Sequence, residues 1–356
     1  MAADENDHIE VKYFKDYSLK EHNTFGIDAK CRRFIEFEDD DEAVEVAKIL
    51  RESAIPYIII GGGSNLLLTK DFDGIVVRSG ILHTGTGTLC NSDLNYTAFL
   101  SPCVKFGSGE VWDDVVAYCV KQGWYGMENL SLIPGDVGAS AVQNIGAYGV
   151  EAKDLIDSVE AVEIATGQVV AISGKDCGYG YRQSKFKQEW KNRYLITHVT
   201  YQLSTSFQPH LDYGNIRQEL EKKGITEPTA KQLRDVIIDI RNAKLPDPKV
   251  EGNAGSFFMN PIVTRQKYEK LAALYPTMPH YEVDGSHEKI PAGWMIEQCG
   301  WKGKSLGRAG VHDKQALVLV NRGGATGAEI VALCDAIRKD VKAKFDIDIH
   351  PEVNII

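Results

Sequence analysis

A chain of 356 residues is long enough for two or three domains with cores of their own. The net charge of -10 argues against a general nucleic-acid binder, because phosphate contacts need a basic surface. No apolar run reaches membrane-spanning length, so we expect no membrane insertion. Met1 to Glu10 is acidic and polar, unlike a signal peptide, so we expect a cytoplasmic protein whose cysteines are reduced and mostly structural.

The hydrophobic pattern predicts helices and strands that alternate along the chain. The first part predicts a helix over 41–51 and strands over 57–60 and 75–77. The middle predicts a helix over 111–120, strands over 159–164, 169–172 and 194–203, and a helix over 233–240. Pro246 and Pro248 then forbid continuation of the helix. Beyond them we expect helices over 266–275, 293–299 and 330–341, a buried strand over 316–320 and a final strand over 347–356.

Two glycine-rich segments are candidates for ligand binding. Gly61-Gly62-Gly63-Ser64-Asn65 follows the strand over 57–60, where backbone amides can bind phosphate oxygens. An ordinary tight turn explains this motif equally well. The segment 133–149 reads as a loop poor in bulky side chains and rich in glycine, with Gln143 and Asn144 inside it. Its composition favours close approach of backbone to a flat or phosphate-bearing ligand over a flexible linker.

The standard nucleotide motifs are incomplete in this sequence. Gly85-Thr86-Gly87 is followed by Cys90 and Gly107-Ser108-Gly109 by Trp112, so neither completes a Rossmann fingerprint. Gly303-Lys304-Ser305 resembles the end of a P-loop, but Gln298 stands at the position of the first glycine. Phosphate-type loops are therefore present without either standard nucleotide fold.

Two polar residues have chemistry that a catalytic site could use. Arg182 follows Tyr181 in a glycine-rich stretch, and a fixed guanidinium can hold a carboxylate through paired hydrogen bonds. Ser256 has no Gly-x-Ser-x-Gly frame and no triad-like partners, which argues against a hydrolase nucleophile. Its hydroxyl could instead relay a proton. Taken singly, a surface arginine and a turn serine are the simpler interpretations. The scattered histidines predict no metal site.

The ordered set of motifs resembles the UDP-N-acetylenolpyruvoylglucosamine reductases, also called UDP-N-acetylmuramate dehydrogenases. The resemblance runs from about Ser18 to Glu352. It is carried by Asn23-Thr24-Phe25, Gly61 to Asn65, Ile133 to Gly149, Tyr181-Arg182, Lys244 to Asn260, Ala292 to Gln298 and Pro351-Glu352. His210-Leu211-Asp212-Tyr213-Gly214-Asn215 is similar to the tyrosine-bearing loop of the family's first type. Met259 departs from the lysine that is frequent after the second phenylalanine in this family.

The resemblance implies an α/β (α+β) fold with a two-subdomain FAD-binding module of the vanillyl-alcohol-oxidase (PCMH) type and a C-terminal α/β substrate-binding domain. The implied divisions are FAD-binding subdomain 1 over 1–75, FAD-binding subdomain 2 over 76–243, a substrate-binding domain over 244–345 and a C-terminal strand over 346–356. It also implies reduction of UDP-N-acetylglucosamine enolpyruvate by NADPH through bound FAD. The oligomeric state is open on the sequence, with a monomer as the default expectation, and the net charge predicts no nucleic-acid partner.

The resemblance assigns residues position by position. The implied catalytic residues are Ser256 as proton donor, with Arg182 and Glu352 around the reacting group. The implied substrate contacts are Tyr181, Tyr213, Lys244, Asn260 and Gln298. The implied FAD contacts are Asn23, Thr24, Gly61, Gly62, Gly63, Ser64, Asn65, Leu66, Ile133, Pro134, Gly135, Gly138, Ala139, Gln143, Asn144, Gly146, Ala147, Tyr148 and Arg182.

The sequence leaves two alternative functions open. A flavin oxidase on the same scaffold would use oxygen in place of the enol ether. A nucleotide-sugar binding protein that has lost its flavin would be colourless and inactive. The preference for NADPH over NADH is not encoded in any motif of this chain.

Overall fold

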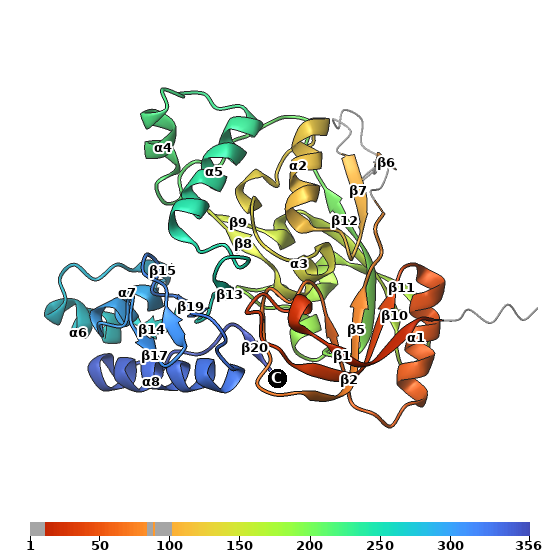
Figure 1. Ribbon diagram of the computed structural model, residues 1–356. Coiled ribbons are helices and arrows are strands. Elements are labelled where there is room, and N and C mark those ends of the chain that lie inside the picture. Colours follow the sequence, from red (N-terminus) through yellow and green to blue (C-terminus); the bar gives the residue numbers. More distant parts are fainter. Residues whose placement is uncertain (1–10, 84–87, 90–101) are drawn as a thin grey trace, which may run out of the picture. The chain divides into compact units, whose positions relative to one another are not determined.

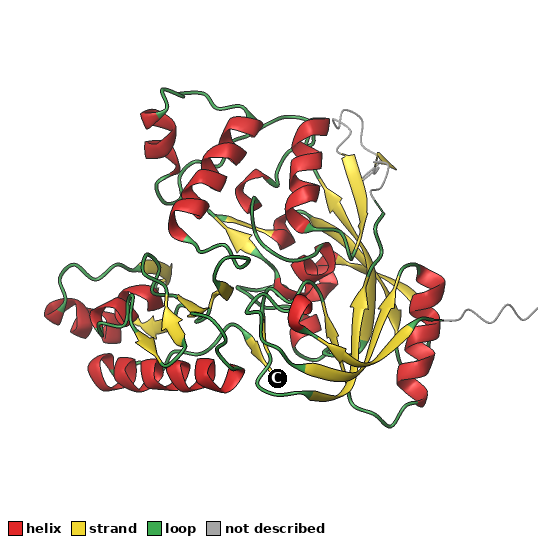
Figure 2. Ribbon diagram, viewed as in Figure 1, coloured by secondary structure: helices red, strands yellow, loops and turns green. Residues whose placement is uncertain are grey.

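The computed structural model describes residues 11–83, 88–89 and 102–356 (Figure 1). The N-terminal segment 1–10, on which the expectation of no signal peptide rests, lies outside them. The chain forms two compact units. The first unit is Met1–Tyr17, Cys31–Gly62 and Asp73–Arg241, and the second is Ser18–Lys30, Gly63–Phe72 and Asn242–Ile356. Both units combine helices with sheets (Figure 2). The predicted division at 75, 243 and 345 stays a prediction.

One sheet of the first unit has the strand order β1-β2-β5-β3. Its strands are β1 (Tyr13–Ser18), β2 (Lys30–Phe37), β3 (Tyr57–Ile60) and β5 (Phe72–Ser79). Helix α1 (Asp40–Glu52) begins after Asp39, whose carboxylate accepts a 2.8 Å hydrogen bond from the Glu42 amide. The helix buries Val46 and Leu50 in a core that also contains residues of β2 and β5. Strand β3 follows α1 in the chain and pairs in parallel with β5.

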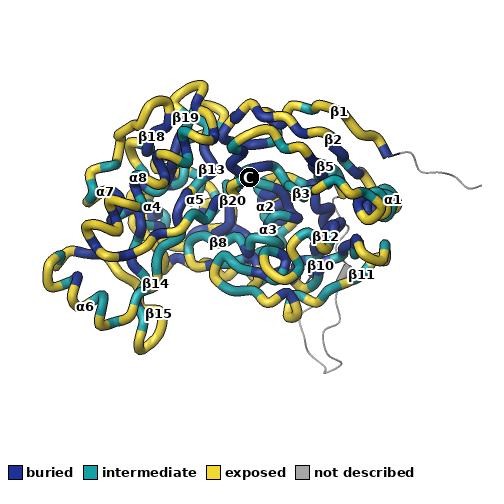
Figure 3. Tube along the Cα trace, turned by 90° about the horizontal axis from the view of Figure 1, so that it is seen from below, coloured by how far each residue is buried: buried dark blue, intermediate teal, exposed yellow. Residues whose placement is uncertain are grey.

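The other large sheet of the first unit has the order β11-β10-β12-β7-β6. Its strands are β6 (Thr88–Leu89), β7 (Pro102–Gly107), β10 (Ile156–Glu163), β11 (Val169–Ser173) and β12 (Tyr194–Gln202). Strand β12 is buried over most of its length (Figure 3). Helices α2 (Trp112–Gln122) and α3 (Val137–Gln143) share a core with this sheet. Helices α4 (Ile216–Lys222) and α5 (Ala230–Lys244) form a smaller core, and β8 (Gly146–Ala147) pairs with β9 (Val150–Glu151).

The second unit is built on a sheet of order β13-β19-β18-β17. Its strands are β13 (Gly252–Ser256), β17 (Ser305–Leu306), β18 (Ala309–Val311) and β19 (Val318–Asn321). Helix α8 (Gly327–Phe345) contacts this sheet and α7 (Ala292–Gln298), and a Thr326–Glu329 capping box starts it. A small sheet of β14 (Ile262–Thr264), β16 (His287–Lys289) and β15 (Tyr281–Asp284) accompanies α6 (Arg265–Leu274). Strand β20 (Asn354–Ile355) pairs in parallel with β4 (Leu66–Leu67).

Three expectations need correction. The segment 133–149 is not a continuous loop, because Val137–Gln143 is helical and buries Val137 and Ala141 against the sheet. The strand expected over 347–356 is limited to Asn354–Ile355, since only these residues pair with β4. Five described cysteines have free thiols, but Cys103 is disulfide-bonded.

Among the described residues, we find no helix with both the length and the apolar character that crossing a membrane requires.

Candidate active site

The two glycine-rich segments meet in the first unit at Gly61 and Gly62. A methyl group on Gly61 would lie 3.3 Å from the Ala139 side chain. One on Gly62 would lie 2.9 Å from Asp136 Oδ1. The absence of a Cβ therefore allows the close packing of the turn after β3 against the start of α3. Inside this region Gly138 approaches Ser108 in the same way, with 2.9 Å from an added methyl group to the Ser108 Cβ.

Polar atoms around this contact suit a large polar cofactor. Within the described part of the chain, Asp136 Oδ2, Gln143 Oε1 and Arg78 Nε are buried without a hydrogen-bond partner. Two of these atoms accept hydrogen bonds and one donates, which matches the hydroxyl, ring N–H and phosphate groups of FAD. Asp136 is also 3.7 Å from Arg78 Nη2. Burial raises the pKa of Asp136 to about 6, although the Arg78 charge opposes this.

Arg182 is tied to the second glycine-rich segment. Its Nη2 donates a 2.7 Å hydrogen bond to the Gly146 carbonyl, and its Nη1 lies 3.5 Å from the Asn144 carbonyl. The guanidinium also lies 5.9 Å from the centre of the Tyr181 ring. Asn144 itself is fully buried, and its side chain bonds to Glu151, Gly180 and Lys153. The structure thus joins the predicted cofactor segment to the predicted catalytic arginine, and gives Asn144 a structural role.

Tyr213 lies against Tyr148 in the same unit. The two rings meet edge to face with their centroids 6.4 Å apart. The Tyr148 hydroxyl is hydrogen-bonded to Arg241, a guanidinium that the sequence reasoning did not single out. Burial lowers the pKa of Arg241, and the nearby Arg182 charge acts in the same direction. Burial raises the pKa of Tyr148, which stays a neutral phenol.

In the second unit the segments that carry Ser256 and Glu352 are paired. The Glu352 amide donates a 2.8 Å hydrogen bond to the Phe257 carbonyl, and the Met259 amide donates a 3.0 Å bond to the His350 carbonyl. Ser256 ends β13 with an exposed side chain, and Glu352 is half-buried. Residues 96 positions apart in sequence thereby lie on neighbouring segments, with the serine hydroxyl accessible to a ligand.

The predicted FAD contacts of the second unit form a connected backbone network. The Asn65 side chain donates to the Glu352 carbonyl at 3.3 Å, and Thr24 Oγ1 donates to the Asn253 carbonyl at 2.5 Å. The Thr24 amide also bonds to the Gly63 carbonyl at 3.2 Å. Asn23 is buried, and its side chain bonds to the backbone of Leu19 and Ile27. These residues position the Gly63 to Asn65 turn beside the strand that leads to Ser256.

The predicted substrate residues of the second unit are not all together. Asn260 Oδ1 accepts a 2.9 Å hydrogen bond from the Ala292 amide at the start of α7. Gln298 is exposed at the other end of that helix. Gln315, which the sequence did not indicate, lies near the start of α7. A methyl group on Gly293 would be 3.2 Å from the Gln315 Oε1. No spacing rule could have identified it. Lys244, at the end of α5, is exposed.

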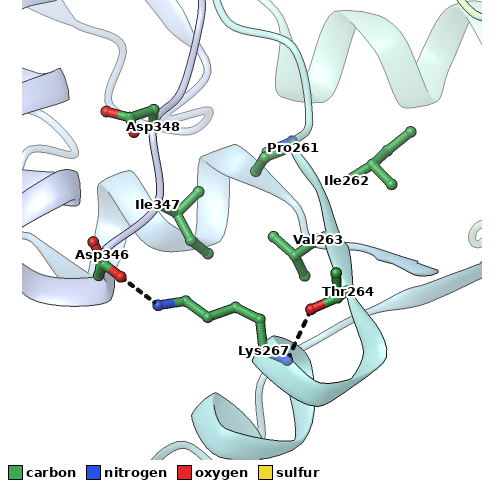
Figure 4. A pocket seen from close by; sticks show the side chains of 8 residues that line it. All are labelled: Pro261, Ile262, Val263, Thr264, Lys267, Asp346, Ile347 and Asp348. Atoms are coloured by element: carbon green, nitrogen blue, oxygen red, sulfur yellow. Dashed lines mark hydrogen bonds and ion pairs between the residues drawn. The ribbon is translucent and has the colours of Figure 1, made fainter. Parts of the chain in front are cut away.

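A surface hollow of about 320 Å³ lies elsewhere in the second unit (Figure 4). It is lined by Pro261–Thr264, Lys267 and Asp346–Asp348, none of which was predicted as a site residue. Lys267 Nζ is 3.0 Å from Asp346 Oδ2, so the charges in the hollow are paired. Among the described residues we also find no group of three or more potential metal ligands.

Comparison with known proteins agrees with this geometry. Residues 247–356 match the family model "UDP-N-acetylenolpyruvoylglucosamine reductase, C-terminal domain", and residues 32–173 match "FAD binding domain". The reductase of Bacteroides fragilis (strain YCH46) is 56% identical over 341 residues, covering 96% of this chain and 99% of that protein. The Pseudomonas aeruginosa PAO1 reductase is 46% identical, covering 95% and 97%. A crystal structure of the reductase from Thermus caldophilus superimposes with a TM-score of 0.65 at 20% identity, covering 97% of this chain and 98% of that one.

The fold, the match to an FAD-binding domain and the named relatives define a flavin-dependent oxidoreductase. This confirms the predicted fold class. Within that class, the near full-length identity shows that the chain belongs to the UDP-N-acetylenolpyruvoylglucosamine reductase family. The resemblance seen in the sequence is confirmed.

Proposed function

We propose that this chain reduces UDP-N-acetylglucosamine enolpyruvate to UDP-N-acetylmuramate, a step of peptidoglycan precursor synthesis, with NADPH as the reductant. The observation that carries the proposal is the backbone pairing of the Ser256 and Glu352 segments in a chain of this family. The sequence places the proposed proton donor, Ser256, and the carboxylate of Glu352 on these two segments, and the fold makes the segments neighbours.

When bound, FAD would supply the hydride that adds to the terminal carbon of the enol ether. Gly61, Gly62 and Gln143 of the first unit would hold the cofactor. The packed glycine turn and the buried acceptor on Gln143 support this assignment.

Addition of a hydride leaves negative charge on the adjacent carbon and on the conjugated carboxylate of the substrate. Arg182 stabilises that charge, because its guanidinium is pre-oriented by the Gly146 carbonyl. Ser256 donates the proton to the carbon that bears the ether oxygen, which completes the lactyl ether. A serine is a weak acid, so it acts only toward a strongly basic carbon held within hydrogen-bond reach. The Glu352 carboxylate orients the Ser256 hydroxyl or returns a proton to it after the transfer.

Tyr181, Tyr213, Lys244 and Asn260 bind the nucleotide-sugar in this proposal. Lys244 provides positive charge for the diphosphate, and Tyr213 covers the substrate from its loop. Gln315 shares the start of α7 with Asn260 and is a better placed partner for it than Gln298. We expect the protein to act as a monomer.

The test separates the two half-reactions of Ser256→Ala. Anaerobic bleaching of the flavin by NADPH should proceed at the wild-type rate. Reoxidation by the enolpyruvyl UDP-sugar should slow by about two orders of magnitude or more, the usual scale for a positioned acid. Ser305→Ala, an exposed serine of β17, is the matched control and should change neither. Equal slowing of both half-reactions would mean that Ser256 is structural, and reoxidation by air without the UDP-sugar would favour an oxidase.

A further inference from the structure

Asn129 connects two segments that the proposed function uses. This residue is 2% exposed in the first unit, within the short turn Glu128–Leu130. Its Nδ2 donates one hydrogen bond of 2.8 Å to the Tyr148 carbonyl and another of 3.0 Å to the His210 carbonyl. Tyr148 belongs to the second glycine-rich segment. His210 begins the loop 210–215, here called the tyrosine loop, which carries Tyr213.

The Tyr148 end of this connection is conformationally demanding. Tyr148 has a φ of 49° and Gly149 a φ of 82°, both in the left-handed region that residues with side chains rarely adopt. Tyr148 is held at both ends, since its carbonyl accepts from Asn129 and its hydroxyl bonds to Arg241. A buried donor on its carbonyl can hold this unusual backbone in place.

The His210 end determines where the tyrosine loop begins. Tyr213 is 46% exposed, so burial alone does not fix its ring. Its contacts include the Tyr148 ring, edge to face, and Gly149, where an added methyl group would lie 3.6 Å from the Tyr213 Cβ. The surface against which Tyr213 rests is therefore the same segment that Asn129 holds.

We propose that Asn129 is a positioning residue for substrate binding, because its amide fixes the tyrosine loop and the Tyr148 turn relative to each other and so sets the place of Tyr213. The inference rests on the proposed function, in which Tyr213 contacts the nucleotide-sugar. Asn129 acts through Tyr213 and does not touch the reacting atoms. Only an N–H donor at this position can serve both carbonyls, since aspartate of the same shape would accept rather than donate.

The test uses the flavin-loaded full chain with Asn129→Asp and Asn129→Ser. Serine keeps one short donor, so its effect should be the smaller. For Asn129→Asp we expect KM for the enolpyruvyl UDP-sugar to rise about tenfold, on the scale of a lost hydrogen bond. The kcat should change less than about threefold. Amide hydrogen exchange of the 207–216 peptide should accelerate, and that of the α8 peptide should not.

A double-mutant cycle distinguishes positioning from general destabilisation. Asn129→Asp combined with Tyr213→Ala should raise KM no further than Tyr213→Ala alone, because both remove the same contribution. Thr326→Ala, which removes the cap of α8 in the second unit, controls for lost stability and should leave KM unchanged.

Two results would overturn the proposal in different ways. Raised KM in Tyr213→Ala with unchanged KM in both Asn129 variants, or fully additive effects, would overturn the role of Asn129 alone. Unchanged KM in Tyr213→Ala would remove the role of Tyr213 in the proposed function, and the role of Asn129 with it. If Asn129→Asp does not fold, the graded comparison of Asn129→Ser with the wild type decides.

Discussion

The substitution Gly63→Ala tests the packing of the turn that leads to the predicted flavin contacts of the second unit. Gly63 has a φ of 66°, and an added Cβ would overlap the His22 carbonyl oxygen and lie 2.8 Å from the Asn23 Cα. The obstacle is backbone on the neighbouring segment, not the end of a flexible side chain. That segment is itself fixed by the buried side chain of Asn23. Accommodation therefore requires movement of the main chain.

Gly26→Ala is the matched control, because Gly26 lies in the same unit with a φ of 65° and an added Cβ would meet nothing within 4 Å. Both variants place alanine in the left-handed region, which costs about 1–2 kcal/mol. Only Gly63→Ala adds overpacking, which costs about 1–3 kcal/mol more. We expect Gly63→Ala to lose about 2–5 kcal/mol of unfolding free energy and the control about 1–2 kcal/mol.

Urea unfolding followed by circular dichroism measures both losses, and absorbance at the flavin bands gives the FAD retained per chain. The Thr24 amide bonds to the Gly63 carbonyl, so displacement of the turn should also reduce FAD retention in Gly63→Ala. Retention in Gly26→Ala should stay close to that of the wild type. Equal loss of stability in the two variants would show that Gly63 does not approach His22 as closely as described, and the reasoning from this contact would be wrong.

Two further predictions concern pH. Burial raises the pKa of Asp136 from 3.8 to about 6. Its contribution to the free energy of unfolding is therefore fully present below pH 4 and is lost as the pH rises to 6. The shift of about two pKa units corresponds to about 3 kcal/mol. Asp136→Asn should remove this decline in unfolding free energy of the flavin-free protein, and an unchanged pH profile would contradict the assignment. Arg234 donates to both carboxylate oxygens of Asp113, at 2.6 and 2.9 Å. Burial raises the Asp113 pKa, but this partner lowers it overall, so Arg234→Met should lose about 2 kcal/mol above pH 4 and progressively less as the pH falls through the lowered pKa. A difference that persists undiminished in acid would point to lost packing.

The sequence predicted the type of an element, helix or strand, correctly where its hydrophobic period was clear. The helices α1, α2, α5 and α8 and the strands β3, β10 and β12 lie where the pattern predicts them, and each of these helices buries one face in a core. Strand β13 was not predicted, since glycine and asparagine have low strand propensity and its pairing with β19 is a long-range contact. Helix α3 was missed for a related reason. Its small residues are typical of a loop in the sequence. The close approach of Gly138 to Ser108, which accounts for a small residue there, is visible only in the tertiary structure.

The candidate site divides in the same way. Sequence alone determined the family, the flavin type of the chemistry, and the residue types on each motif, because an ordered set of motifs is a local property of the chain. Tertiary structure alone decided which motifs are neighbours. It paired the Ser256 segment with Glu352, tied Arg182 to Gly146, and joined the Asn260 side chain to the start of α7. It also revealed Asn129, because hydrogen bonds between residues far apart in sequence depend on packing, which no local pattern encodes.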